Sequence, residues 1–580
     1  MDAIEDIEDA LSIDIPATDS FRIEDCRRLT GPGLLWDSPG AVVQVELGLE
    51  FSTITLIDTW NSHARRTLDA VGWQAEKITS RAYDGGVNLA ISAPMDQLYS
   101  AVFVAQTAMH FCAAEILGTP SGDFDAMIKD LLDVMIREAN PNLIALAIAA
   151  HSHNIDVLAD DDFVSIGHGA GSQTWPIHDI PDIANVPWEK LHNVPLAMIT
   201  GTNGKTTTTR LCAAIAQASG KVSGLTSTDF VSVGKDVLDQ GDYSGPGGAR
   251  LLLRDQRLEI GILEVARGGI LRRGLPTRGV HAAVVTNVAA DHLGQYGVNT
   301  VPELTRAKFA VHRSLSPDGV LILNADDHFV VAESSVTDAN ICWFSLDPNS
   351  LQINEALALS QPCAWLEGGE LKHFDGAQTS NIIPAIEIPI AMLGAAKYNL
   401  SNCLAAICVA KSLGIDNGAI VEGLRQFKNN PDDNPGRLNE FEHNGARIFV
   451  DFAHNPHSVS AVAETISGIP AKRRFIMLSH AGDRSDQDIV DVTTTALTMS
   501  PDCVVAVELA DYLRGRQLGE VSKIIKTTVL AQDYGEDQIV MRDSPLKGVE
   551  YILTQLQPDD VALLLVLSER DEVFNLLRKS

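Results

Sequence analysis

The sequence predicts a multidomain α/β protein built around a doubly wound, mostly parallel sheet. From residue 195 to about 430, the apolar runs AMITG, IGILEVA, AAVVTNV and VLILNAD alternate with helical patterns, as in repeated βα units. The first run breaks into a glycine-bearing loop, and a helical pattern follows it. A second alternation, with strands near IFVDFA, RFIMLSH, CVVAVEL and VALLLVLS, predicts a Rossmann-like C-terminal α/β domain.

The residues before 195 predict an N-terminal α+β domain and a connecting piece. Residues Val42 to Leu49 alternate like a strand, and Asp96 to Leu117 form an apolar helical pattern that ends at Gly118. A small helix-plus-strand piece follows at 140–173, and the proline-rich stretch from Trp175 to Pro195 is typical of a linker. We therefore expect an N-terminal domain (1–135), a connecting segment (136–194), a central domain (195–430) and a C-terminal domain (431–580).

The amino-acid composition limits which binding partners and which cellular compartment we expect for this protein. The net charge of −32 argues against nucleic acid or an anionic membrane as a partner, because both need a basic surface. The eight cysteines include no Cys-x-x-Cys pair, which predicts buried thiols in a reducing compartment. The acidic N-terminus lacks the features of a signal peptide, and no apolar run approaches the ~18 residues of a membrane span. We expect a cytoplasmic protein.

The segment Met198–Arg210, MITGTNGKTTTTR, predicts an ATP site. Backbone N–H groups of the loop and of the helix N-terminus can face phosphate, Lys205 can reach the outer phosphates, and the Thr206 hydroxyl can ligate Mg²⁺. A lone Gly-Lys-Thr often only begins a helix, and Ile199 stands where the general phosphate-loop pattern has glycine. The compact Gly-Thr-Asn-Gly-Lys-Thr form nevertheless favours ATP. The predicted nucleotide contacts of this loop are Gly201, Thr202, Asn203, Gly204, Lys205, Thr206 and Thr207.

Two further segments follow strands of the predicted central sheet. Glu264 opens EVARGGILRRG and can hold a metal or position a group near the γ-phosphate; the alternative is a glycine-bearing turn with surface arginines. TNVAADHL contains His292, which can ligate a metal, and Asp291, which can orient the imidazole. A lone Asp-His pair is more often structural.

Two more segments lie nearer the C-terminus. Asn399 and Asn402 lie one helical turn apart in KYNLSN, where an amide can contact an adenine edge; helix capping is the alternative for Asn399. Arg437 in NPGRL can neutralise phosphate charge, and Asp451 in VDFAHNPH can accept hydrogen bonds from ribose hydroxyls.

In this order the segments resemble the Mur ligase superfamily. EVARGGILRRGL, DYSGPGGARLLLRD, TNVAADHLGQYGVNT and GDRSDQDI match its cyanophycin-synthetase branch in particular, over about 195–580. Residues 28–49, RLTGPGLLWDSPGAVVQVELGL, are more loosely similar to the N-terminal domain of that branch. Those relatives carry an ATP-grasp domain between the two parts; here only a remnant of its opening (140–171) and the linker stand there.

The resemblance implies an ADP-forming acid–amino-acid ligase that joins an amine to a carboxylate through an acyl phosphate. By resemblance, Lys205 contacts the β- and γ-phosphates, Thr206 and Glu264 hold one Mg²⁺, and His292 helps to hold a second. Asn402, Arg437 and Asp451 then hold the nucleotide. The resemblance further implies small amino acid or peptide substrates and a homo-oligomer.

Some roles stay open at the level of sequence. Lys308 stands close to where many Mur ligases carry a carbamylated lysine, and a solvent-facing helix lysine is at least as compatible with the pattern. Candidate contacts for the amine substrate, with surface hydrogen bonding as the alternative, are His454, Asp483, Arg484 and Arg514. The alternative to a ligase is an ATP-binding scaffold without chemistry, which retention of Lys205, Thr206, Glu264 and His292 disfavours.

Overall fold

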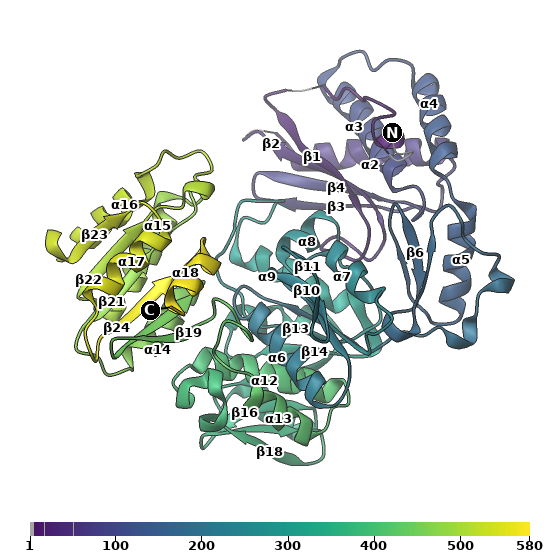
Figure 1. Ribbon diagram of the computed structural model, residues 1–580. Helices are drawn as coiled ribbons and strands as arrows, with labels where there is room; N and C mark the ends of the chain where they lie inside the picture. The colour runs from purple at the N-terminus through teal and green to yellow at the C-terminus, as the bar shows by residue number, and fades with distance from the viewer. Residues whose placement is uncertain (1–4, 17, 50, 580) are drawn as a thin grey trace. The chain divides into compact units, whose positions relative to one another are not determined.

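The computed structural model describes residues 5–16, 18–49 and 51–579, which form two compact units (Figure 1). The first unit contains the residues up to Phe344 together with Ser350–Cys363 and Ala405–Asp416. The second contains Ser345–Asn349, Ala364–Leu404 and the chain from Asn417 onward. The predicted N-terminal sheet and the predicted phosphate loop both belong to the first unit.

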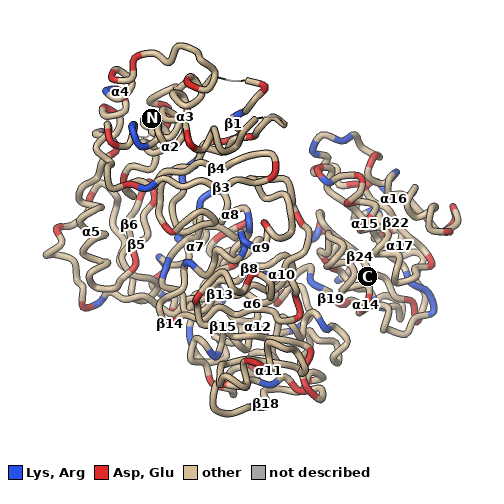
Figure 2. The backbone as a smooth tube through the Cα atoms, turned by 180° about the vertical axis from the view of Figure 1, so that it is seen from behind, with Lys and Arg blue, Asp and Glu red and all other residues tan. Residues whose placement is uncertain are grey.

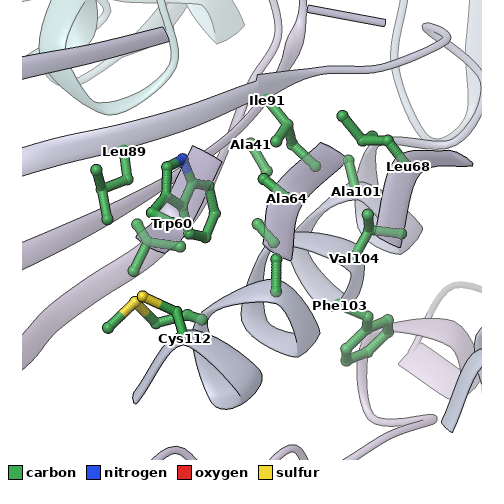
Figure 3. Packing of buried hydrophobic residues seen from close by; sticks show 14 of the residues in the cluster. Ala41, Trp60, Ala64, Leu68, Leu89, Ile91, Ala101, Phe103, Val104 and Cys112 are labelled. Carbon is green, nitrogen blue, oxygen red and sulfur yellow. The ribbon is translucent and has the colours of Figure 1, made fainter. Parts of the chain in front are cut away.

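The N-terminal domain is an antiparallel sheet with helices packed on one face. Its strands lie in the order β1-β2-β4-β3. They span Phe21–Leu29 (β1), Gly40–Leu47 (β2), Ile78–Tyr83 (β3) and Gly86–Ser92 (β4). Its helices are α1 (Glu5–Glu8), α2 (Thr53–Ala70), α3 (Leu98–Leu117) and α4 (Phe124–Glu138). Figure 3 shows the buried Trp60 indole of α2 beside Leu89 of β4, at the centre of this core. The predicted strand and long apolar helix are both confirmed.

Helix α3 corrects the expectation that no apolar run is long enough to span a membrane. Its 20 residues pass that test by length and composition, with a hydropathy of 1.3. However, the helix is mostly buried inside the protein, where it packs against α2, α4 and the sheet. A helix that is apolar on all sides is expected at the centre of such a core.

A small three-stranded antiparallel sheet connects this domain to the central one. It contains β5 (Val157–Ala159), β6 (Phe163–Ile166) and β7 (Gln173–Pro176), preceded by helix α5 (Pro141–Ser152). The proline-rich stretch that follows forms only short 3₁₀ turns at Ile183–Asn185 and Trp188–Lys190. The helix-plus-strand piece and the linker thus form as predicted, although Trp175 and Pro176 already belong to β7.

The central sheet of the first unit is doubly wound and mostly parallel, as predicted. Its strands lie in the order β11-β10-β9-β12-β8-β13-β14-β15. The pairs from β9–β12 to β14–β15 are parallel, whereas β9–β10 and β10–β11 are antiparallel. The strands are β8 (Leu196–Thr200), β9 (Ser223–Thr226), β10 (Phe230–Val233), β11 (Asp236–Gln240), β12 (Ile260–Glu264), β13 (Val280–Val285), β14 (Leu315–Asn324) and β15 (Asn340–Ser345). The helices are α6 (Lys205–Ala218), α7 (Pro246–Leu253), α8 (Arg267–Arg272), α9 (Val301–Phe309), α10 (His328–Glu333) and α11 (Leu351–Ala358). Every residue of β8 and β12 is buried, as expected of strands covered on both faces.

The second unit ends in a six-stranded sheet with helices on both faces. The strand order is β19-β20-β24-β21-β22-β23, with only β19 antiparallel. The strands are β19 (Asn439–His443), β20 (Ala446–Asp451), β21 (Arg474–Leu478), β22 (Cys503–Val507), β23 (Ile539–Arg542) and β24 (Val561–Leu565). Helices α14 (Pro456–Ser467), α15 (Asp486–Ala496) and α16 (Glu520–Leu530) contribute to one core cluster, and α17 (Pro545–Gln555) and α18 (Arg570–Leu577) to the other.

The chain between β15 and β19 continues the strand order of the central sheet with three short strands and also forms two helices. They are β16 (Cys363–Glu367), β17 (Glu370–Phe374), β18 (Thr379–Pro384), α12 (Lys397–Ser412) and α13 (Asn417–Gln426). Strands β17 and β18 form an antiparallel hairpin. The mostly parallel sheet from Asn439 onward confirms the predicted Rossmann-like α/β fold of the C-terminal part of the chain.

Candidate active site

Strand order explains why three distant segments meet at one edge of the central sheet. β8 lies between β12 and β13, and all three run parallel. Their carboxyl ends therefore lie side by side, and they lead into the phosphate loop, Glu264 and the segment Thr286–His292. The chain winds outward on both sides of β8, and the crevice at such a reversal is where open α/β sheets bind ligands.

The phosphate loop is held in place by the segment that follows β13. Gly201 adopts φ +145°, and a Cβ there would collide with the Thr286 hydroxyl. The Asn203 N–H donates to Asn287 Oδ1 at 2.9 Å, and Asn287 Nδ2 donates back to the Asn203 carbonyl at 2.9 Å. The Thr286 hydroxyl also donates to that carbonyl, at 2.7 Å. These contacts preorganise the loop for an anion.

Helix α6 presents the predicted cation and hydroxyl at its first turn. Lys205 Nζ donates to the Thr202 carbonyl at 2.9 Å, so its charge lies over the loop. The Thr206 hydroxyl donates to Glu264 Oε1 at 3.2 Å, and Glu264 is buried with only 2% of its surface exposed. A buried carboxylate beside a hydroxyl is a set of oxygen donors that suits Mg²⁺. Thr207, predicted as a nucleotide contact, is buried in the same turn.

His292 lies on the loop after β13 in a left-handed conformation, at φ 49°. Its Nε2 is 3.9 Å from Asp291 Oδ1, which is longer than a hydrogen bond, so the orienting role of Asp291 stays a prediction. Arg267, at the start of α8, donates to the His292 carbonyl and to Gln295 Oε1, the latter at 2.7 Å. Sequence reasoning did not single out Arg267, although its place directly after the Glu264 strand was a usable signal.

Lys308 is buried, so the alternative of a solvent-facing helix lysine is wrong. The residue is only 4% exposed, and its Nζ donates to the Gly201 carbonyl at 2.7 Å. Burial, followed by the nearby charge of Lys205, holds the pKa of Lys308 well below its usual value. Lys308 therefore belongs to the immediate surroundings of the phosphate loop.

In the second unit, the predicted nucleotide contacts form two groups, and each group is held by its own hydrogen bonds. Asn402 Nδ2 donates to Asn399 Oδ1 at 3.2 Å, so the two amides share a helix face as predicted, and Asn399 donates to the Ile390 carbonyl at 2.8 Å. Asp451 accepts the Leu438 and Ala453 N–H groups, both at 2.7 Å. Burial raises the pKa of Asp451 to about 6, and Arg437 opposes that shift.

The candidate contacts for the amine lie on loops of the same sheet. Asp483 pairs with Arg514 at 2.5 Å, which joins the loop after β21 to the loop after β22. Arg516 donates to the carbonyls of Gly482 and Arg484, at 2.9 and 2.6 Å, and was not predicted. The His454 ring lies 3.0 Å from the Phe452 carbonyl. The structure thus brings Asp483, Arg484 and Arg514 together.

Family models match both sheets. Residues 199–410 match the Mur ligase middle domain, and residues 436–565 match the Mur ligase glutamate ligase domain. Among solved structures, FolC of E. coli in complex with ADP superimposes with a TM-score of 0.50 at 16% identity, over 67% of this chain and 90% of that one. The match shows a common fold.

The sequence is also similar to those of known ligases. The chain is 36% identical to the cyanophycin synthetase of Crocosphaera subtropica over 378 residues, which are 65% of this chain and 43% of that protein. It is 27% identical over 305 residues to a UDP-N-acetylmuramoyl-L-alanyl-D-glutamate–2,6-diaminopimelate ligase of Listeria monocytogenes, over 50% of this chain and 57% of that one. The chain spans less than half the length of the cyanophycin synthetase.

Proposed function

The chain belongs to the Mur ligase superfamily, and we propose that it is an ATP-dependent ligase that joins an amino acid amine to a carboxylate. The observation that carries the proposal is the cluster of Lys205, Thr206 and Glu264 at the carboxyl ends of β8 and β12. This cluster can hold Mg²⁺ at the phosphates, as both a ligase and an ATP-binding scaffold require, and ADP release distinguishes the two.

The proposed reaction has two steps. A substrate carboxylate oxygen attacks the γ-phosphorus of ATP, and the bond between that phosphorus and the β,γ-bridging oxygen breaks. ADP departs, and the substrate is now an acyl phosphate. The amine nitrogen then attacks the acyl carbon, phosphate departs, and the amine loses a proton. The protein contributes mainly positioning and neutralisation of the charge that develops on the phosphates.

The residues of the first unit have distinct tasks in this scheme. Lys205 and the N-terminal N–H groups of α6 bind the β- and γ-phosphates. Thr206 and Glu264 would hold Mg²⁺, and His292 would contribute to a second metal position; when bound, the metal supplies positive charge near the γ-phosphate. Arg267 fixes the His292 loop through its bonds to the His292 carbonyl and to Gln295.

We assign the residues of the second unit to nucleotide and amine. Asn402, Arg437 and Asp451 contact the nucleotide, since they offer amide, cation and carboxylate groups that suit its base, phosphates and ribose. The linked loops of Asp483, Arg484 and Arg514, with His454, bind the amine-bearing amino acid. Both assignments are tested by substitution after a substrate pair has been found.

The decisive experiment measures ADP release from ATP and Mg²⁺ over a panel of amino acids and short peptides, singly and in pairs. We expect release that requires both an acid and an amine, with a product heavier by the amine minus water in mass spectrometry. ATP binding without ADP release for any pair would instead support the scaffold. The Lys205→Ala variant serves as the control for contaminating ATPase.

A further inference from the structure

The loop that carries His292 is strongly bent. It runs from Asp291 to Asn299, and both His292 and Tyr296 adopt left-handed conformations, at φ 49° and 55°. Non-glycine residues rarely take this conformation, and they keep it only where surrounding contacts hold them. Two backbone hydrogen bonds within the loop, of 2.9 and 3.1 Å, close it on itself. The contacts that fix its position in the protein come from outside the loop.

The hairpin of β3 and β4 in the N-terminal domain supplies several of these contacts. Arg81 of β3 donates a hydrogen bond to the Gly297 carbonyl, and Asn299 Nδ2 donates to the carbonyl of Asp84 in the hairpin turn at 2.7 Å. The Tyr83 ring packs against Gly297 so closely that a Cβ there would lie 2.5 Å from the ring. Figure 1 and Figure 2 both place β3 beside α8 and α9 of the central domain. The hairpin thus holds the far end of the His292 loop.

Arg81 also reaches a second segment, the start of α9. Its Nη1 lies 3.5 Å from Glu303 Oε1, and the two side chains are only 18% and 13% exposed. The other carboxylate oxygen of Glu303 accepts two backbone N–H groups at the start of the helix, at 2.8 and 3.1 Å. The same helix carries Lys308, whose Nζ donates to the Gly201 carbonyl of the phosphate loop. One guanidinium of the N-terminal domain therefore contacts both the His292 loop and the helix that supports the phosphate loop.

The burial of Arg81 makes its contacts specific. Burial lowers the pKa of Arg81, and the carboxylate of Glu303 opposes that shift. A buried guanidinium is stable only where its N–H groups have partners, and a bond to a carbonyl fixes direction as well as distance. An apolar side chain of similar length could fill this space, but it could not hold the Gly297 carbonyl. On its other side the loop is held by Arg267, which donates to the His292 carbonyl.

We propose that Arg81 is a positioning residue for the ligase reaction and that it acts through His292. By fixing Gly297, it holds the bent loop in the conformation that presents the imidazole for metal binding. The N-terminal domain is thereby part of the machinery of the reaction. The role of His292 rests on the proposed function, whereas the hold of Arg81 on the loop does not.

The first measurement is hydrogen exchange by mass spectrometry on the full chain, which reports on the loop directly. Arg81→Met keeps the approximate length of the side chain and removes its charge and its donors. We expect the amides of residues 291–299 to exchange about tenfold faster in this variant, because loss of a charged hydrogen bond raises the population of open conformations by about that factor. Arg81→Lys keeps the charge and one donor group, and its exchange should fall between those of Arg81→Met and the parent.

Arg65→Met is the matched control. Arg65 lies on α2 of the same domain, pairs with one carboxylate and donates to two backbone carbonyls, at 2.8 and 3.0 Å. Its replacement removes bonds of the same kind without touching the loop, so exchange at 291–299 should stay unchanged. If Arg81→Met does not fold, Asn299→Ala removes the other hydrogen bond to the hairpin and should also speed exchange.

The second measurement asks whether the loop acts on the metal. Mn²⁺ is titrated into the protein with the β,γ-imido analogue of ATP, and bound Mn²⁺ is counted by electron paramagnetic resonance. We expect two bound Mn²⁺ ions in the parent. In Arg81→Met the weaker ion should lose about tenfold in affinity, while affinity for the analogue stays unchanged. With a substrate pair that supports ADP release, kcat should fall by a similar factor and the KM for ATP should not change.

Unchanged exchange at 291–299 in Arg81→Met would overturn the proposal, as would faster exchange with unchanged Mn²⁺ affinity. An effect of Arg65→Met as large as that of Arg81→Met would do the same, because it would indicate a general loss of stability of the N-terminal domain. A parent that binds one Mn²⁺ ion or none would refute the metal role of His292 in the proposed function, and the exchange result would still decide whether Arg81 holds the loop.

Discussion

Replacing Lys205 by alanine is expected to weaken ATP binding and to abolish ADP release while the fold persists. In the structure the ammonium lies half-buried over the phosphate loop, 2.9 Å from the Thr202 carbonyl. A hydrogen bond to a charged group contributes about 1.5–3 kcal/mol, which corresponds to a loss of roughly 10- to 100-fold in nucleotide affinity. Losing a preorganised contact to the reacting phosphate costs a further factor of about 10²–10³ in rate.

The same substitution has a small cost in stability. Only the bond to the Thr202 carbonyl is lost within the protein, which costs about 1 kcal/mol, so the melting temperature should fall by a few degrees at most. Nucleotide affinity is measured by titration calorimetry, ADP release by a coupled assay, and folding by circular dichroism. Lys221→Ala is the matched control, because Lys221 belongs to the same domain, is 54% exposed and forms a surface ion pair with Glu259.

The outcome that would refute the reasoning is specific. If Lys205→Ala kept ATP affinity and turnover within about threefold of the parent, as Lys221→Ala should, the phosphate loop would not be the nucleotide site. An unfolded variant would be followed by Lys205→Met, which keeps the length of the side chain and removes only the charge.

Four further outcomes are expected. Glu264→Gln should raise the Mg²⁺ concentration needed for half-maximal ADP release by tenfold or more, because an amide is a weaker metal ligand; an unchanged Mg²⁺ titration would exclude it as a ligand. His292→Ala should slow acyl-phosphate formation more than it weakens ATP binding, and the reverse result in single-turnover experiments would make its role wrong. Burial raises the pKa of Asp156 to about 6. Since a carboxyl with a raised pKa destabilises the fold as pH rises from about 4 to about 6, Asp156→Asn should gain about 1 kcal/mol over the parent between pH 5 and pH 7; denaturation curves that stay parallel would contradict this. Purified protein given aspartate, arginine, ATP and Mg²⁺ should form no alternating polymer by light scattering and mass spectrometry, and polymer growth would reveal a second ligase site.

The local pattern of the sequence was sufficient to predict the elements of the site. Strand β8, the loop Gly201–Gly204 and helix α6 follow from an apolar run, two glycines and a helical period, which are properties of neighbouring residues. The same reasoning placed Glu264 and His292 at strand ends. The retained family motifs then joined these pieces into one expected site.

Tertiary structure determined the contacts between residues that are far apart in the sequence, which no local sequence pattern predicts. The position of β8 between β12 and β13 brings Glu264 to the Thr206 hydroxyl, across 58 positions of sequence. The burial of Lys308 against the Gly201 carbonyl could not be read from a helix that carries lysine and arginine in its last turn. Arg272 and Arg273 resemble surface residues in sequence, and they line a cavity only because the N-terminal sheet packs against α8. Such contacts depend on the packing of surfaces from distant segments, whereas helices, strands and turns are determined by residues a few positions apart.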